Sequence, residues 1–180
     1  MLGDLSYEYD AAGRRTAMGG SYARTSLPQA LASSSYNDGN QLTQRGAATF
    51  TYDEAGNLTS DGANTYRWNA RNQLASISGT VSASFQYDAF GRRVSKTVGS
   101  STSGYLYDGA DAVQEIAGGS PVANMLVSGM DEVFTRMDST GTTSRLADGL
   151  GSTLALIDSS GAAQNEYTYD PFGNTTVSAT

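Results

Sequence analysis

The stretch Tyr52-Asp53-Glu54-Ala55-Gly56-Asn57-Leu58 contains the pattern that decides the fold, and versions of it recur along the chain. In each copy an aromatic residue is followed at once by Asp or Asn, and Gly, Asn or Asp stands four positions after the aromatic. We call this first residue the key aromatic. The seven key aromatics are Tyr9, Tyr36, Tyr52, Trp68, Tyr87, Tyr107 and Tyr169. A repeated strand-and-turn unit, more than any catalytic residue, therefore defines this protein.

Each copy has the chemistry of a β-hairpin. Another aromatic usually stands two positions before the key aromatic, as Phe50 does before Tyr52, and a period of two places both rings on one face of a strand. The Asp or Asn that follows can accept a hydrogen bond from a backbone N–H two residues on and so start a turn. The residue four positions after the key aromatic is of a type that tolerates positive φ: Gly13, Asn40, Gly56, Asn72, Gly91, Asp111 or Gly173.

The chain is expected to reverse at these positions. The returning strand then begins six positions after the key aromatic, at Leu42, Leu58, Leu74 and Val113. The short intervals between the middle copies fit one hairpin each, and a unit of this size cannot bury its apolar face without a neighbour. Residues 26–35 are expected to form a loop, and a different block fills the interval between Tyr107 and Tyr169.

These features predict an all-β fold. Consecutive antiparallel β-hairpins are expected to form a curved, spiralling strip of sheet, as a partial shell or an open barrel. Leu, Ile, Val and Phe are scarce, but eleven Tyr and one Trp supply large buriable surface, and the net charge is only −7. Cross-strand aromatic pairs contribute roughly 0.2–1 kcal/mol each, so ordered β-structure with a thin core is favoured over disorder.

The pattern resembles the YD-repeat, or RHS-repeat, family over nearly the whole chain. Residues 148–153, 156–161 and 167–173 are similar to the opening of the RHS-associated core, in which a D-x-L-G-S segment precedes a strand, a D-x-x-G turn and a Y-D-P-F-G motif. On this resemblance, residues 1–120 are hairpin repeats and residues 121–180 are the opening part of that core, continuous with the same sheet. Gly149 and Leu154 stand where many relatives have His and Arg.

The resemblance implies an architectural, non-enzymatic role. Members of the family are large bacterial surface or secreted proteins, whose repeats wind into a hollow shell around a variable C-terminal toxin. In many of them a later part of the core carries an aspartate-dependent self-cleavage site. The present sequence stops before such a segment and before a toxin, so we expect one arc of a shell. A secreted or cell-surface parent, with an enclosed toxin as partner, is the corresponding expectation.

Composition excludes several other functions. An acidic balance argues against nucleic-acid binding, which needs clustered Lys and Arg. No run of about 18 apolar residues encodes a membrane span, and the start shows no signal peptide. The absence of Cys excludes disulfides and thiolate metal sites, and the absence of His excludes the common catalytic triads. We expect no metal and no cofactor.

Three alternatives remain open. Lys96 could act as a base for Ser95, although a solvated edge lysine is favoured. A hydrolase of activated esters or phosphoesters would use carboxylates, or a metal bound by them, from the candidates Asp131, Glu132, Asp138, Asp148 and Asp158. Asp138 and Asp158 also open ordinary turns that end in Gly. A carbohydrate-binding module would use the rings of Tyr52, Trp68, Tyr87 and Tyr107, although packing of these rings across strands is favoured.

Unpaired strand edges predict a second copy of this chain as a further partner. A strip of sheet leaves backbone N–H and C=O groups free at both of its ends. We therefore expect self-association through exposed edges.

Overall fold

All regular structure in the described residues is β-strand. The computed structural model describes residues 3–28, 30, 33–128 and 132–179. Every strand pairing within them is antiparallel, and most join strands that are consecutive along the chain. The prediction of an all-β fold built from consecutive antiparallel hairpins is confirmed.

The strands form three sheets. The smallest is β1 (Ser6–Tyr9) with β2 (Arg15–Gly19), and the next is β3 (Ser34–Tyr36), β4 (Leu42–Arg45) and β5 (Ala48–Thr49). The third sheet has fourteen strands in chain order and does not close on itself. Its strands are β6 (Thr51–Tyr52), β7 (Leu58–Ser60), β8 (Asn64–Trp68), β9 (Leu74–Gly79), β10 (Ala83–Tyr87), β11 (Arg93–Val98), β12 (Ser101–Asp108), β13 (Asp111–Ala117), β14 (Ser120–Val127), β15 (Val133–Asp138), β16 (Gly141–Ala147), β17 (Thr153–Ile157), β18 (Ala163–Tyr169) and β19 (Thr175–Ala179).

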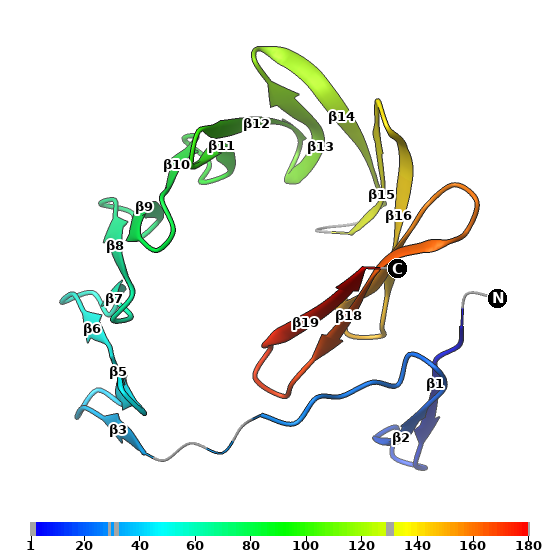
Figure 1. Ribbon diagram of the computed structural model, residues 1–180, viewed down its shortest axis with the longest axis horizontal. Coiled ribbons are helices and arrows are strands. Elements are labelled where there is room, and N and C mark those ends of the chain that lie inside the picture. The colour runs from blue at the N-terminus through cyan, green and yellow to red at the C-terminus, as the bar shows by residue number, and fades with distance from the viewer. Residues whose placement is uncertain (1–2, 29, 31–32, 129–131, 180) are drawn as a thin grey trace. The chain divides into compact units, whose positions relative to one another are not determined.

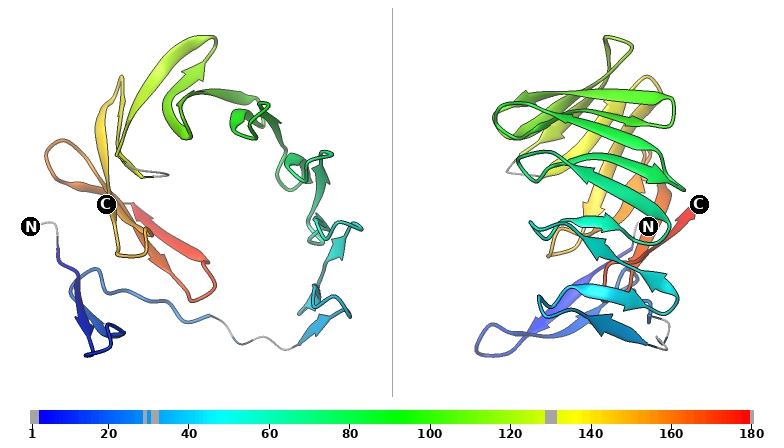
Figure 2. Two further views of the ribbon diagram at one scale, coloured as in Figure 1. Left: turned by 180° about the vertical axis from the view of Figure 1, so that it is seen from behind. Right: turned by 90° about the vertical axis from the view of Figure 1, so that its left-hand side faces the viewer.

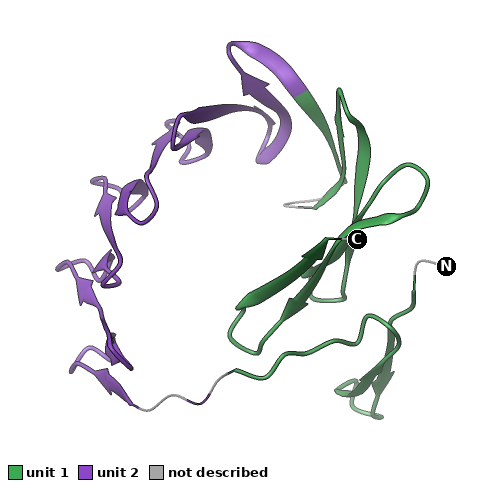
Figure 3. Ribbon diagram, viewed as in Figure 1, with its two compact units in different colours: residues 1–29, 123–180 green, residues 30–122 purple. Residues whose placement is uncertain are grey.

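The chain divides into two compact units, which Figure 3 colours separately. Unit 1 consists of residues 1–29 and 123–180, and unit 2 of residues 30–122, so the boundary between them falls inside β14. Within unit 2 the hairpins follow one another along a curved strip (Figure 1). The side view in Figure 2 shows these hairpins one above another in chain order. The predicted division into residues 1–120 and 121–180 stays a prediction.

The core is thin because most side chains have a sheet on one side only. Among the described residues, only Tyr22, Ala83, Ala123 and Ala155 are buried apolar side chains. Half-buried and exposed residues alternate along β8, where Tyr66 and Trp68 lie on the half-buried face, and along the end of β10, where Phe85 and Tyr87 do. The predicted placement of two rings on one strand face is therefore confirmed.

Most turns place a β-bulge directly before the key aromatic. Tyr52 lies opposite Leu58, and the register shifts between Thr51 and Tyr52. The same irregularity precedes Tyr9, Tyr36, Trp68, Tyr87 and Tyr107. A bulge bends its strand and increases the local twist, so its repetition favours a curved strip over a flat sheet.

The turn after Tyr107 differs from the prediction. Gly109, with φ of 59°, and Ala110 alone connect Asp108 to Asp111, which are paired across the hairpin. A two-residue turn with Gly at its first position supplies the positive φ there. Asp111 therefore does not have positive φ, and the returning strand begins at Asp111 instead of Val113. By contrast, Leu42, Leu58 and Leu74 begin β4, β7 and β9 as predicted.

One further expectation needs correction. Ser34 and Ser35 belong to β3, where they pair with Arg45 and Gln44, so the loop expected over residues 26–35 ends earlier.

The interval between Tyr107 and Tyr169 also forms antiparallel strands, β12 to β18. Its turns at Asp148 and Asp158 make the bonds of the repeated turn, whereas the turns after Asp108, Ala117 and Asp138 have two residues each. The expectation of a different block there stays a prediction.

Candidate functional site

The recurring turn is the most regularly built feature of the chain, and Asp88 illustrates its geometry. The backbone N–H of Asp88 donates to the Arg92 carbonyl at 3.0 Å, and the Gly91 N–H donates to the Asp88 carbonyl at 3.1 Å. One carboxylate oxygen of Asp88 accepts from the N–H groups of Phe90 and Arg92, both at 2.9 Å. Gly91 has φ of 87°. The backbone N–H groups of Asp88, Phe90, Gly91 and Arg92 thus all find acceptors inside the turn.

The second side-chain atom of the Asp or Asn pairs with the residue four positions further on. Where the turn begins with Asp, that residue donates, as the Arg92 guanidinium does to Asp88 at 2.7 Å. Where the turn begins with Asn, the residue is Gln and accepts, as Gln73 does from Asn69 at 2.9 Å. The donating partners of Asp10, Asp53 and Asp170 are Arg14, Asn57 and Asn174, and the accepting partner of Asn37 is Gln41. Each turn therefore carries a matched donor and acceptor pair.

The polar atom of the key aromatic connects neighbouring turn units. The Trp68 indole N–H donates to the Leu58 carbonyl at 2.8 Å, and the Tyr87 hydroxyl donates to the Leu74 carbonyl at 3.0 Å. Equivalent bonds join Tyr52 to Leu42, Tyr107 to Arg93 and Tyr169 to Thr153. In each case the acceptor residue begins the returning strand of the preceding turn, or is the first residue after the turn. We call this contact the aromatic joint.

One aromatic joint links two separate sheets. Tyr52 lies in the fourteen-stranded sheet, and its acceptor Leu42 lies in β4 of the three-stranded sheet. The Phe50 N–H also donates to the Thr43 carbonyl at 2.9 Å. The joint therefore continues the strip at a point where strand pairing is interrupted.

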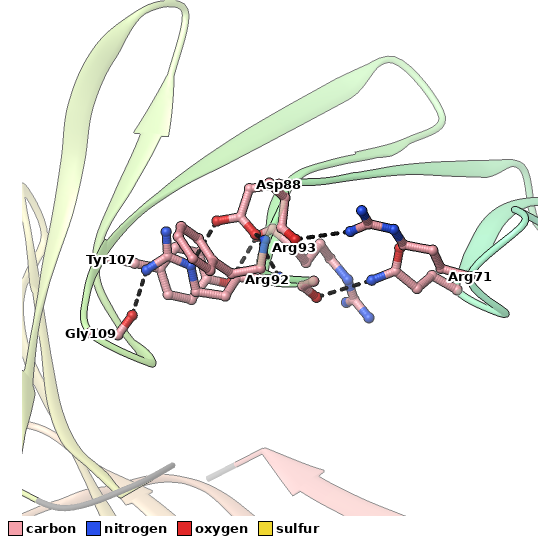
Figure 4. A network of polar contacts seen from close by, with 10 residues as sticks. Arg71, Asp88, Arg92, Arg93, Tyr107 and Gly109 are labelled. Carbon is pink, nitrogen blue, oxygen red and sulfur yellow. Dashed lines mark hydrogen bonds and ion pairs between the residues drawn. The ribbon is translucent and has the colours of Figure 1, made fainter.

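Turn tips in unit 2 also contact one another directly, as Figure 4 shows for the region around Asp88. The Arg71 guanidinium donates to the Ala89 carbonyl at 2.9 Å, and the Arg92 guanidinium reaches the Gly109 carbonyl of the next turn. Arg92 also lies over the ring of Tyr107, 5.0 Å from its centroid. Charge-assisted bonds and cation–π contacts thus tie three consecutive turns together.

An open groove of about 590 Å³ lies beside this network. Its lining includes the amides of Asn69 and Gln73, the guanidinium of Arg71 and the rings of Phe85 and Tyr87. The groove is polar, with side chains that hydrogen-bond to turn carbonyls. Its polar side chains are thus already engaged in contacts between neighbouring turns.

The turn carboxylates are held in their charged form. Burial acts to raise the pKa of Asp88, but hydrogen bonds from the Arg92 guanidinium and from backbone N–H groups outweigh it, and the pKa lies below its ordinary value. The Asn57 side chain and N–H lower the pKa of Asp53 in the same way, and the Asn174 side chain lowers that of Asp170. A carboxylate with a lowered pKa is a weak base near neutral pH.

The candidate catalytic carboxylates lie at separate turns. Asp148 accepts from the N–H groups of Leu150 and Ser152, both at 2.9 Å. The hydroxyl of Ser160 lowers the pKa of Asp158, and that of Thr140 lowers the pKa of Asp138, which also pairs with Arg136. Glu132 accepts from the Ser128 hydroxyl at 3.2 Å, and Asp131 lies outside the described residues. Within the described part of the chain no group of three or more His, Cys, Asp and Glu could hold a metal ion.

Lys96 is not an edge residue. It lies in β11, which pairs with β10 on one side and β12 on the other, and it is half-buried. Its ammonium lies 5.9 Å from the centroid of the Tyr105 ring. The expectation of a solvated edge lysine was wrong because the hairpin repeat leaves no free edge at this strand.

The aromatic candidates for sugar binding all serve as donors in aromatic joints. Tyr52, Trp68, Tyr87 and Tyr107 are half-buried, so part of each ring remains accessible. Burial raises the pKa of Tyr107 and keeps its hydroxyl protonated. Their proposed role in binding stays a prediction.

Two turns of the same kind lack an aromatic residue at the key position. Asp148 and Asp158 make the same backbone bonds as Asp88, with Gly151 and Gly161 at positive φ. The residues before them, at the key position, are Ala147 and Ile157. The turn predicted at Asp158 is confirmed, and the same spacing of Asp and Gly is the sequence signal for the turn at Asp148.

Comparison with known proteins agrees with this architecture. The family model described as Teneurin YD-shell matches residues 4–180. No curated protein matches the sequence. Among the described residues, no helix is long and apolar enough to cross a membrane.

Solved structures with a similar fold come from toxin complexes. The structure of a Photorhabdus luminescens Tc holotoxin pore with a mutant TccC3 matches with a TM-score of 0.54 at 16% identity. The crystal structure of TcdB2-TccC3 without its hypervariable C-terminal region also gives 0.54, at 14% identity. Each match covers 99% of this chain but only 14% of the other, so the chain spans about one seventh of those proteins.

Proposed function

The chain belongs to the Teneurin YD-shell family, and from that membership we propose that it is a non-enzymatic segment of a shell wall. The observation that carries this proposal is the aromatic joint. Each joint ties a turn unit to the one before it, from Tyr52 through Tyr107 and again at Tyr169. A chain built in this way extends a sheet unit by unit, as a wall requires, and uses its most distinctive side chains to do so.

The chemistry of the turns supports a structural role over a catalytic one. The carboxylates at Asp88, Asp138 and Asp158 have lowered pKa values and accept hydrogen bonds from their own turns. Such groups are fixed as anions and do not exchange protons near neutral pH. A hydrolase based on these carboxylates is therefore not the function that the geometry supports best.

We further propose that the parent protein is a secreted bacterial protein whose shell encloses a variable C-terminal region. Support comes from the similar structures, which belong to a Tc holotoxin pore and to a TcdB2-TccC3 complex whose C-terminal region is called hypervariable. These likenesses concern the fold, since the identities are 16% and 14%. Secretion, enclosure and assembly with toxin components are carried over to this chain as proposals.

Limited proteolysis of the parent protein tests enclosure. The coding sequence around this segment is expressed whole, and a short protease site is introduced into the region C-terminal to the shell. We expect cleavage at that site to be much slower in the intact parent than in the same C-terminal region expressed alone. Equal rates would contradict enclosure. A matched parent with the site inserted at the turn tip of Phe90, which is 85% exposed, reports on protease access in general.

A further inference from the structure

The N-terminal hairpin is held to the rest of unit 1 without strand pairing. Strands β1 and β2 pair with each other and belong to no larger sheet. Residues 1–29 nevertheless form one compact unit with residues 123–180. Contacts of side chains and loop backbone must therefore make this attachment.

The clearest of these contacts is a bidentate ion pair. The two terminal nitrogens of Arg24 lie 2.6 and 3.2 Å from the two carboxylate oxygens of Glu166 in β18. The Arg24 side chain is 33% exposed and that of Glu166 is 22% exposed. Arg24 is itself positioned, because its Nε donates to the Ser21 carbonyl at 3.0 Å and its guanidinium lies over the Tyr22 ring. A guanidinium held in this orientation can donate two parallel hydrogen bonds to a carboxylate.

Two further hydrogen bonds flank the ion pair. The Ser26 N–H donates to the Tyr169 carbonyl at 3.2 Å, and the Gly149 N–H donates to the Tyr7 hydroxyl at 3.0 Å. A Cβ on Gly149 would lie in ordinary contact with the Tyr7 ring at 3.4 Å, so a branched side chain that extends toward the ring would crowd it. Gly149 does not have positive φ. Its missing side chain therefore provides space for Tyr7 and is not needed for the backbone conformation.

Apolar contact completes the attachment. Tyr22 is 6% exposed and is the only buried large apolar side chain in the described chain. A cavity of about 220 Å³ between the two segments is lined from one side by Tyr22 and Arg24 and from the other by Leu154 and Tyr167. Leu154 lines this cavity, and Gly149 lies at the same surface through its bond to Tyr7.

We propose that Gly149, Leu154, Glu166 and Tyr169 form a docking surface, and that its occupant is the chain's own segment of residues 4–27, which we call the strap. The strap joins two segments of unit 1 that residues 30–122 separate in the sequence. Its side-chain contacts make this long-range link without strand pairing, whereas a disulfide would make such a link covalently. This inference goes beyond the proposed wall function and does not depend on it.

A charge-reversal cycle tests the strap in the whole chain. The variants are Arg24→Glu, Glu166→Arg and the double variant, and hydrogen exchange is measured at the amides of Ser26 and Gly149. We expect each single reversal to speed exchange of both amides by roughly tenfold or more, and the double variant to restore most of the protection. The matched control is Arg14→Glu, because Arg14 is 80% exposed and its partner Asp10 lies in its own turn.

A second pair of variants keeps the test valid if charge reversal unfolds the protein. Gly149→Val removes space for Tyr7 and is compared with Ser159→Val, at the same position of the turn that begins at Asp158. We expect exchange at the Ser26 amide to rise in the first variant only, while amides of β11 keep their protection. Unchanged exchange at Ser26 in both Arg24→Glu and Gly149→Val, or a double reversal no better than the singles, would overturn the strap.

Discussion

At the residue scale, five of the seven key aromatics use the polar atom of the ring as a hydrogen-bond donor. All seven key aromatics are Tyr or Trp, whereas Phe50 and Phe85 stand two positions earlier. The aromatic joint accounts for five of them, since a hydroxyl or an indole N–H can donate to the carbonyl of the preceding unit and a Phe ring cannot; these five are Tyr52, Trp68, Tyr87, Tyr107 and Tyr169. The ring provides burial at both positions, but the donor is needed at one of them only.

Removal of one donor should weaken the sheet measurably. Tyr87→Phe deletes the hydroxyl that donates to the Leu74 carbonyl and keeps the ring. We expect the free energy of unfolding in urea to fall by about 0.5–1.5 kcal/mol, the usual net value of such a bond. Tyr9→Phe is the control, because the Tyr9 side chain is 61% exposed. Equal losses in the two variants would contradict the aromatic joint.

The turn glycines should respond to substitution according to their φ angle. Gly91→Ala forces a Cβ into the left-handed region at φ of 87° and should cost roughly 1–2 kcal/mol of unfolding free energy. Gly104 lies in β12 without positive φ, and a Cβ there meets Ile116 at an ordinary 3.5 Å. Gly104→Ala should therefore show no such loss, which thermal unfolding of both variants will check.

At the element scale, the sequence predicts the turns more accurately than it predicts where the strands begin and end. The positive φ predicted at Gly13, Asn40, Gly56, Asn72, Gly91 and Gly173 is confirmed, because the bonds that impose it lie within a few residues. The prediction was wrong at Asp111 because Gly109 offered a tighter turn two residues earlier. The turns at Asp148 and Asp158 form without an aromatic residue at the key position, because the Asp side chain and the Gly supply their bonds and their positive φ.

The turn carboxylates should make stability depend on acid. Hydrogen bonds lower the folded-state pKa of Asp10, Asp53, Asp88 and Asp170. A lowered pKa means that the stabilisation is complete above the ordinary Asp value of about 3.9 and is lost as pH falls through the folded-state value. We therefore expect the unfolding midpoint in urea to be steady from about pH 7 to 5 and to fall steeply below about pH 4. The Asp88→Asn variant should show a shallower fall, and an identical profile would argue against the turn network.

At the scale of the whole molecule, the chain order of the strands follows from the repeat, whereas the attachment of the N-terminal hairpin does not. Antiparallel neighbours are the simple result of short turns between short strands. The pair of Arg24 with Glu166 joins residues far apart in sequence, and no local pattern marks either of them as a partner. Contacts of this kind depend on the whole fold and could not be predicted from the sequence alone.

Self-association through a strand edge is a proposal that belongs to this scale. Strand β19 pairs only with β18, and all five of its residues are exposed. Val177→Lys places a charge on this edge and should shift sedimentation toward the monomer. Val98→Lys is the matched control, because Val98 has similar exposure but lies in β11, which has neighbours on both sides. No change with Val177→Lys in a chain that self-associates would exclude this edge.

The exchange rate of the Trp68 indole proton tests the central claim most directly. Trp68 is the only tryptophan, so its indole N–H gives a single resolved signal in a proton NMR spectrum. If the key aromatics are structural joints, the bond to the Leu58 carbonyl should slow exchange by roughly two orders of magnitude or more, and protection should be lost together with that of the sheet amides. An indole proton that exchanges as fast as free tryptophan would mean that the rings are open platforms for a ligand, and would contradict the wall function proposed for this chain.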